Sequence, residues 1–276
     1  MFCKPSEPKL ASDHATLAET LRVLEQRRRM LRWMAGLGVA AALPVRSFAC
    51  TLIPSETGGP YPGDGTNGPN VLTQSGILRS DIRASFGSAG TTVASGTLNT
   101  IKLKLLSATD TSCGIVEGLA VYLWHCDAGG GYSLYSSGVT AQNYLRGVQV
   151  TDANGEATFT SIYPGCYSGR WPHIHFEIYA AVADATSGRN AIRTSQIALP
   201  QAASQSVYAQ SSLYPGSAGN LSQVSLASDN VFGDDGGVYE LGTVTGDNTG
   251  GYLTTLEVGV AIDSTSDRIF GDKFEA

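Results

Sequence analysis

After residue 50, apolar and polar residues alternate along six short runs of the chain. A period of two is typical of strands that bury one face, and clusters of Gly, Asn, Asp and Pro between the runs are typical of turns. We therefore predict an all-β fold, a β-sandwich with mixed sheets. The predicted strands are residues 97–106, 118–125, 147–151, 156–162, 173–179 and 251–262.

The turn at residues 152–155, Asp-Ala-Asn-Gly, lies between two alternating runs and predicts a β-hairpin. Residues 52–84 and 200–250 are rich in Gly, Ser, Asn and Pro and show little periodicity. Irregular segments of this length in a compact domain are either disordered or functional, so we expect long irregular loops here. No internal repeat or second domain is evident.

The first 49 residues have the organisation of an export signal. A basic segment at 26–32 precedes an apolar run at 33–43 and the small residues Ser47 and Ala49. The run is too short to span a bilayer, and its paired arginines resemble a twin-arginine signal, which directs folded proteins to export. We expect a signal peptide at 1–49 and one mature domain at 50–276, in the periplasm or outside the cell; an amphipathic helix is the alternative.

Charge separates the predicted leader from the rest of the chain. Eight of the 18 Lys and Arg and four of the 24 Asp and Glu lie in the first 49 residues, which leaves 10 basic and 20 acidic residues in the mature part. An acidic exported protein is a poor partner for nucleic acid or, after signal cleavage, for an anionic membrane. We therefore expect a small-molecule partner.

Four cysteines remain after the predicted cleavage: Cys50, Cys113, Cys126 and Cys166. An even number in an oxidising compartment suggests two disulfides. A bond between Cys113 and Cys126 is disfavoured, because the ends of one strand of that length lie ~40 Å apart. Of the remaining pairings we prefer Cys50–Cys113 with Cys126–Cys166. Lipidation of Cys50 is an alternative that a poor lipobox does not favour.

The candidate chemistry lies at residues 163–176. His173 and His175 are two apart on a predicted strand, so both imidazoles lie on one face and can bind one metal. Two surface histidines on an edge strand are the alternative. Tyr167 precedes them across a Pro- and Gly-containing bend. A phenol has a pKa near ~10 and ligates as tyrosinate only to a strongly Lewis-acidic ion, which favours ferric iron over zinc.

These residues resemble a known family. Pro164-Gly165-Cys166-Tyr167, Arg170 and Pro172-His173-Ile174-His175-Phe176 are similar to the iron motif of the intradiol ring-cleavage dioxygenases. The stretch 118–127 with Gly131-Tyr132-Ser133 looks like the strand and turn that carry the family's other tyrosine ligand. Residues 57–61, Thr-Gly-Gly-Pro-Tyr, resemble its early segment near the substrate. Residues 145–152 and 228–232 are similar to stretches of its secreted bacterial branch.

The resemblance implies an intradiol dioxygenase-like fold and Fe(III) bound by Tyr132, Tyr167, His173 and His175. It implies that Tyr167 leaves the metal when substrate binds and that Arg170 lies beside the substrate ring. Tyr61 would line the substrate pocket. The substrates would be a catechol-type diol and O2, and cleavage between the two hydroxyl-bearing carbons would give a muconate-type dicarboxylic acid. Cys166 and the short segment between Tyr167 and His173 depart from the family pattern and bear on which diol fits.

Two other classes compete with this interpretation. A non-catalytic secreted β-sandwich binding module explains the fold and the export signal, but it leaves four iron-type ligands in the family's order without a purpose. A zinc or copper enzyme that uses the two histidines leaves both tyrosines without one. We expect His125 to be a packed histidine, Asp127 to cap a turn or orient Tyr132, and the subunit state to be a monomer or small homo-oligomer.

Overall fold

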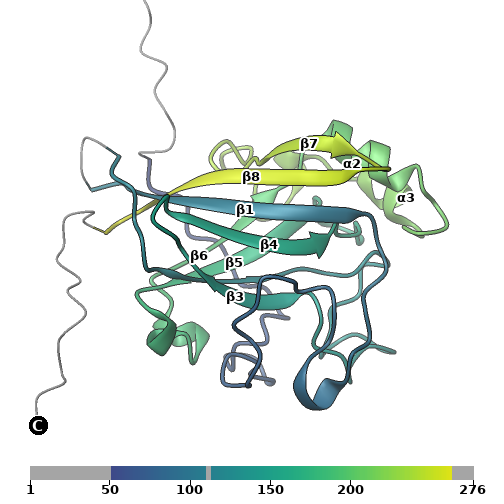
Figure 1. The fold of residues 1–276 in the computed structure, drawn as a ribbon. Coiled ribbons are helices and arrows are strands. Elements are labelled where there is room, and N and C mark those ends of the chain that lie inside the picture. Colours follow the sequence, from purple (N-terminus) through teal and green to yellow (C-terminus); the bar gives the residue numbers. More distant parts are fainter. Residues whose placement is uncertain (1–50, 110–112, 263–276) are drawn as a thin grey trace, which may run out of the picture. The chain divides into compact units, whose positions relative to one another are not determined.

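The computed structural model describes residues 51–109 and 113–262. Eight strands dominate this part of the chain (Figure 1). The predicted signal peptide and Cys50 lie outside the described residues. The strands are β1 (Leu98–Ser107), β2 (Ala120–Trp124), β3 (Arg146–Val150), β4 (Glu156–Ile162), β5 (His173–Tyr179), β6 (Arg193–Ala198), β7 (Thr243–Asp247) and β8 (Gly251–Val260).

The strands form two four-stranded sheets. The first has the order β4-β1-β8-β7, in which β1 and β8 are parallel and the other pairs antiparallel. The second has the order β3-β2-β5-β6 and is antiparallel throughout. The predicted all-β sandwich is therefore confirmed, with the mixture of pairing directions confined to the first sheet.

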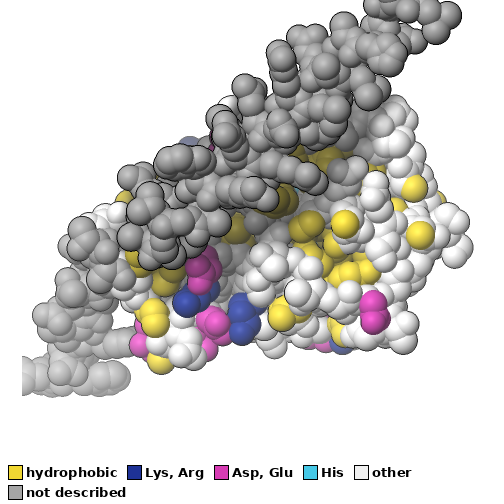
Figure 2. All heavy atoms as spheres, turned by 90° about the horizontal axis from the view of Figure 1, so that it is seen from above, with side chains coloured by type: hydrophobic (Ala, Val, Ile, Leu, Met, Phe, Trp, Pro, Cys, Tyr) yellow, Lys and Arg dark blue, Asp and Glu magenta, His cyan; other side chains and the backbone are white. Residues whose placement is uncertain are grey.

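The core lies between the sheets, where inward side chains of alternating positions meet. Ile101 and Leu103 of β1 and Phe159 of β4 belong to the same buried cluster as Ile174 and Phe176 of β5. The outward face of the first sheet is polar and carries ion pairs of Lys102 with Glu156 and of Lys104 with Glu257. In Figure 2, basic and acidic side chains lie next to each other on the face seen from above.

The second sheet is buried on both faces, because the long loops cover the face turned away from the first sheet. Tyr122 and Trp124 of β2 and Tyr179 of β5 pack there against Val71 and Leu72 of the segment that precedes β1. In Figure 1 this segment, coloured purple to blue, runs beside β3 on the far side from β1 and β8. The loop-covered face is where β5 presents both candidate metal-binding histidines.

The predicted β-hairpin at residues 152–155 was wrong. The turn at 152–155 forms, with Asp152 Oδ1 accepting hydrogen bonds from the N–H groups of Asn154 and Glu156. The strands on either side of it do not pair, because β3 bonds to β2 in one sheet and β4 to β1 in the other. The turn therefore connects the two sheets and does not close a hairpin.

The segment 200–250 is more regular than its composition indicates. It contains α2 (Gln201–Tyr208), which follows Pro200, as well as α3 (Ser217–Leu221) and β7. Short 3-10 turns lie at Gly87–Ala89, Val182–Asp184, Gly188–Asn190 and Leu226–Ser228. None of the helices in the described part of the chain is long and apolar enough to cross a bilayer.

The predicted disulfide between Cys126 and Cys166 is absent, and both are free, buried thiols. Each sulfur points to a backbone carbonyl, that of Cys126 to Gly165 at 3.4 Å and that of Cys166 to Arg170 at 3.5 Å. Burial raises the pKa of Cys126 far above its ordinary value and that of Cys166 to about 12. Cys113 is disulfide-bonded, and its predicted partner Cys50 lies outside the described residues.

Candidate metal centre

Four side-chain atoms converge at the start of β5. The Nε2 atoms of His173 and His175 lie 3.1 Å apart, and the Tyr132 hydroxyl lies 3.3 Å and 3.2 Å from them respectively. The Tyr167 hydroxyl lies 3.1 Å from His173 Nε2 and 3.5 Å from the Tyr132 hydroxyl. The structure thus brings together all four residues that the sequence predicts as iron ligands.

The backbone of β5 accounts for the position of the two histidines. Residues two apart in a strand point to the same face, and both imidazoles lie on the loop-covered face. The ring of His175 stacks on Trp124, its neighbour across the β2–β5 pair, with 4.9 Å between ring centroids and 4° between planes. His173 Nδ1 lies 2.5 Å from the carbonyl oxygen of Trp171. Both rings are therefore fixed with Nε2 directed at the centre.

Two glycines allow the tyrosine-bearing segments to approach each other. Gly130 has φ +85°, and a Cβ there would lie 3.2 Å from the Cβ of Tyr167. A Cβ at Gly165 would lie 2.6 Å from the carbonyl oxygen of Ala128, so this position excludes any side chain. The bend that carries Tyr167 therefore packs directly on the turn that leads to Tyr132.

Asp127 holds that turn in place. Its Oδ1 accepts hydrogen bonds from the N–H groups of Gly129 and Gly131, and its Oδ2 accepts one from the Tyr144 hydroxyl. Asp127 thus caps the turn and at the same time fixes the residue before Tyr132, so the two roles considered for it coincide.

The protonation states of the two histidines favour a bound metal ion. Without one, the hydrogen-bonding capacity of the cluster is poorly satisfied. Burial, followed by the charge of Arg170, lowers the pKa of His173 to about 3, and burial lowers the pKa of His175 well below its ordinary value. The Nδ1–H group of neutral His173 donates to the carbonyl oxygen of Trp171. Its Nε2 then offers a single lone pair, although the Tyr132 hydroxyl, the Tyr167 hydroxyl and His175 Nε2 all lie next to it. Nδ1 of His175 is buried without a hydrogen-bond partner, so Nε2 is the ring nitrogen that faces polar neighbours, namely His173 Nε2 and the Tyr132 hydroxyl.

The two phenols need a strong Lewis acid to ionise here. Burial raises the pKa of Tyr132 well above its ordinary value and that of Tyr167 to about 12. Within the described ranges, no group of three or more His, Cys, Asp or Glu residues is placed to hold a metal. The candidate donor set is two imidazole nitrogens and two phenol oxygens, and such oxygen donors suit a hard ion such as Fe(III). The residues present therefore fit ferric iron.

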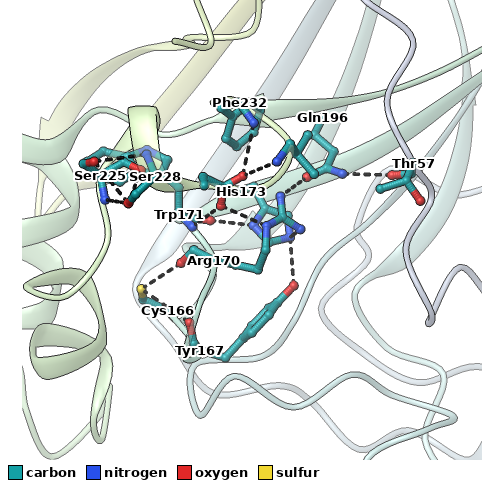
Figure 3. A network of polar contacts seen from close by, with 12 residues as sticks. Thr57, Cys166, Tyr167, Arg170, Trp171, His173, Gln196, Ser225, Ser228 and Phe232 are labelled. Carbon is teal, nitrogen blue, oxygen red and sulfur yellow. Dashed lines mark hydrogen bonds and ion pairs between the residues drawn. The ribbon is translucent and has the colours of Figure 1, made fainter. Parts of the chain in front are cut away.

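Arg170 lies at the edge of the cluster, with its Nη1 3.5 Å from His173 Nε2. Its Nε donates to Asp229 Oδ2 at 2.9 Å, and its Nη2 donates to Gln196 Oε1 at 2.6 Å. Gln196 in turn donates from Nε2 to the carbonyl of Thr57. Figure 3 shows Arg170 beside His173, with Gln196 and Thr57 to one side and Tyr167 below.

Tyr61 covers the centre from the loop before β1. The residue is 38 % exposed, and its ring lies 5.2 Å from the Tyr132 ring and 5.1 Å from the Tyr135 ring, measured between centroids. A Cβ at Gly59, two residues earlier, would lie 3.5 Å from Cε1 of His175. The 57–61 segment therefore lies against the cluster, as the predicted pocket role of Tyr61 requires.

His125 is not part of the cluster. Its Nδ1 donates to the carbonyl of Cys126, and its Nε2 lies 2.7 Å from the Ser161 hydroxyl. Burial lowers its pKa to about 4. It is a packed, neutral histidine, as the sequence interpretation expected.

Sequence reasoning did not predict three supporting residues. Asp229 orients Arg170, and its Oδ1 accepts from the N–H groups of Val231 and Phe232. Gln196 lies on β6, a strand whose sequence does not alternate between apolar and polar residues and which was not predicted. Arg146, buried on β3, donates to the carbonyls of Tyr61, Pro62 and Ser133 and so connects the pocket segment to the Tyr132 turn.

Comparison with known proteins agrees with this fold. The dioxygenase family model matches residues 107–205, which include Tyr132, Tyr167, Arg170 and both candidate histidines. The chain is similar to the intradiol ring-cleavage dioxygenase from Tetranychus urticae, at 24 % identity and a TM-score of 0.56 over 79 % of this chain and 98 % of that one. A second dioxygenase crystal structure matches over the same shares at 24 % identity and a TM-score of 0.57. No curated protein sequence matches.

The family match covers residues 107–205, and the solved structures are similar over most of the chain. At these identities the two solved structures establish the fold, and the family model covers the segment that carries the candidate ligands. The resemblance to the intradiol ring-cleavage dioxygenases is confirmed.

Proposed function

We propose that the chain is a non-haem Fe(III) intradiol dioxygenase that binds iron through Tyr132, Tyr167, His173 and His175. The observation that carries this proposal is the convergence of two phenol oxygens and two imidazole nitrogens within 3.1–3.5 Å at one end of β5. The reaction is insertion of both atoms of O2 into a catechol-type ring, with cleavage between the hydroxyl-bearing carbons to a muconate-type dicarboxylic acid. When bound, ferric iron supplies Lewis acidity that binds the diol as a dianion and makes its ring reactive toward O2.

Tyr167 is suited to move a proton. It is partly exposed, whereas Tyr132 and both histidines are buried, so it is the donor that can leave the cluster at least cost in packing. A phenol whose pKa burial raises to about 12 is a strong base when ionised. The Tyr167 oxygen is therefore placed to accept one of the two protons that a diol loses on binding.

Arg170 is suited to stabilise negative charge on the ring. Asp229 and Gln196 fix its guanidinium within 3.5 Å of His173 Nε2, so the cation is oriented before substrate enters. A preorganised charge stabilises developing charge without reorganisation of the site. Tyr61 and Trp124 bound the space around the cluster and limit access of water.

We also propose that residues 1–49 act as a twin-arginine-type signal peptide and that residues 50–276 form the exported mature domain. Support comes from the paired arginines, the short apolar run and the net acidity of the remainder. Export after folding would allow iron to be bound in the cytoplasm.

Oxygen uptake by the iron-loaded protein tests the proposed activity. With uncharged ortho-diphenols such as catechol and 4-ethylcatechol, we expect consumption of O2 and a ring-opened diacid in which both atoms of ¹⁸O2 appear. Arg170→Gln should lower kcat and leave iron content unchanged. Iron-loaded protein that consumes no O2 with these diphenols, or that opens the ring outside the hydroxyl-bearing carbons, would overturn the proposal.

A further inference from the structure

Side chains from the region of α2 and α3 hold the backbone that leads to Tyr167. The Tyr214 hydroxyl donates to the carbonyl of Tyr163, and the Tyr208 hydroxyl donates to the carbonyl of Pro164, each at 3.0 Å. Both donor tyrosines are buried. These contacts fix the backbone just after β4, where the bend that carries Tyr167 begins.

The contacts from this region end at Cys166, the residue before Tyr167. The N–H group of Cys166 donates to Ser217 Oγ at 3.0 Å, and its carbonyl accepts from Asn220 Nδ2 at 2.7 Å. Ser217 and Asn220 both lie on α3, and Ser217 is buried. Both polar backbone groups of Cys166 are therefore bonded to one short helix. We call Ser217 and Asn220 the α3 clamp.

The turn beyond Cys166 is more open. Ser168 and Gly169 are exposed, and the N–H group of Arg170 donates to the carbonyl of Tyr167 at a long 3.4 Å. Gly169 has φ +83°, and a Cβ there would meet no atom of the described chain within 4 Å beyond its own neighbours. In Figure 3 the ring of Tyr167 extends from the backbone beside Cys166 toward His173. The backbone thus changes from fully bonded to open at the point where Tyr167 begins.

We propose that the α3 clamp positions Tyr167 by fixing the pivot about which this side chain leaves the candidate metal centre and returns to it. The inference rests on the proposed function only in that Tyr167 binds iron and departs when a diol binds. A side chain on a fixed backbone has less freedom to lose on binding than one on a loose backbone. The clamp therefore favours the state in which Tyr167 is bound, and it acts through the backbone of Cys166.

Loss of the clamp should shift Tyr167 toward the released state. Because a diol takes the position that Tyr167 leaves, its apparent Kd falls as the released state becomes more populated. In ferric-loaded Asn220→Ala we expect catechol, without oxygen, to bind about threefold to tenfold more tightly, the effect of one hydrogen bond. The variant should also lose iron to a chelator faster, because one ligand is held less firmly. General damage to the site would instead weaken catechol binding.

A double-mutant cycle assigns the effect to Tyr167. In the Tyr167→Phe background, which lacks the phenol oxygen, Asn220→Ala should leave the Kd for catechol unchanged within about twofold. Asn220→Gln retains an amide donor, so its Kd should lie closer to that of the wild-type protein than the Kd of Asn220→Ala does.

Asn248→Ala is the matched control. Asn248 Nδ2 also donates to a backbone carbonyl, that of Ser206 on α2, at 2.9 Å. This variant loosens the same region without touching the segment before Tyr167, so catechol binding and iron loss should match those of the wild-type protein. If Tyr167→Phe does not fold or retain iron, this comparison decides alone, and equal behaviour of Asn220→Ala and Asn248→Ala would overturn the inference.

The results separate the two proposals. If catechol is cleaved but Asn220→Ala binds it no more tightly than the wild-type protein, or if the change persists in the Tyr167→Phe background, the clamp inference is wrong and the dioxygenase assignment stands. If the ferric protein has a tyrosinate band but consumes no O2 with catechol, the proposed activity is wrong. The clamp inference then stands if Asn220→Ala still tightens catechol binding and loses this effect with Tyr167→Phe.

Discussion

Arg170 and Asp229 form a nearly buried ion pair, with Arg170 Nε 2.9 Å from Asp229 Oδ2 and side-chain exposures of 13 % and 0 %. The same carboxylate oxygen accepts a hydrogen bond from the N–H group of Trp171. Asp229 thus fixes both the side chain of Arg170 and the backbone that leads into His173. These contacts, together with charge-assisted bonding, hold the pKa of Asp229 below its ordinary value despite burial.

Asp229→Asn should therefore impair catalysis more than iron binding. An amide nitrogen in place of Oδ2 would face two donors, so Arg170 would lose its orientation. We expect kcat with catechol to fall roughly tenfold to hundredfold, with iron content retained. Asp247→Asn is a matched control, because Asp247 also accepts backbone N–H bonds, from Thr249 and Gly250, but lies in the exposed β7–β8 turn. Equal losses in both variants would contradict the positioning role.

Arg146→Met should destabilise the fold and loosen the site together. The guanidinium of Arg146 binds the segment at Tyr61 and Pro62 to the turn at Ser133, and its partners among the described residues are all neutral oxygens. We expect a loss of about 3 kcal/mol in the free energy of unfolding and weaker retention of iron.

Urea titration and dialysis against a chelator measure the two effects of Arg146→Met. Arg83→Met is the control, since Arg83 is exposed and pairs with the exposed Asp81. It should change the free energy of unfolding by less than about 1 kcal/mol. Unaltered iron retention in the Arg146 variant would refute its role in holding the site.

His125 predicts a loss of stability in weak acid. Its pKa is about 4 in the folded chain and about 6.5 in the unfolded one, so between these values the unfolded chain binds more protons. The free energy of unfolding is therefore highest, as far as His125 is concerned, above about pH 6.5. It falls by up to about 3 kcal/mol as the pH decreases toward 4. His125→Gln should flatten the dependence of the unfolding free energy on pH between 4 and 7, and an unchanged slope would contradict this account.

The strand pattern explains which parts of the fold were predictable. Strands β1, β2, β3, β4, β5 and β8 have alternating or continuous apolar residues and lie within a residue or two of their predicted bounds. The sequence of β6 lacks this alternation because polar Thr194 and Gln196, which pair with Glu177 and His175 of β5, lie on the loop-covered side, where Gln196 bonds to Arg170 and Thr57. Strand β7 is polar, mostly exposed and at the edge of its sheet. Its sequence therefore has no apolar alternation from which a strand could be predicted.

The residues of the candidate site also fall into those that the sequence predicts and those that it does not. Four of the site residues lie within nine positions of one another: Tyr167, Arg170, His173 and His175. Tyr132 follows a strand that the pattern predicts. All five can therefore be identified from sequence spacing. Asp229 and Gln196 act on Arg170 across 59 and 26 residues, through contacts that exist only after the loop and β6 fold onto β5. The error over Cys126 and Cys166 has a similar cause, because spacing does not reveal that both sulfurs point to carbonyls.

Visible absorption of the ferric-loaded protein tests the assignment of the four ligands most directly. Tyrosinate bound to Fe(III) absorbs visible light, so we predict a red to burgundy protein with stoichiometric iron and a diminished or shifted band in Tyr132→Phe and Tyr167→Phe. Tyr252→Phe, a tyrosine of the sandwich core, should leave the band unchanged. A protein that stays colourless after ferric reconstitution, or a wild-type band in both site variants, would contradict the assignment.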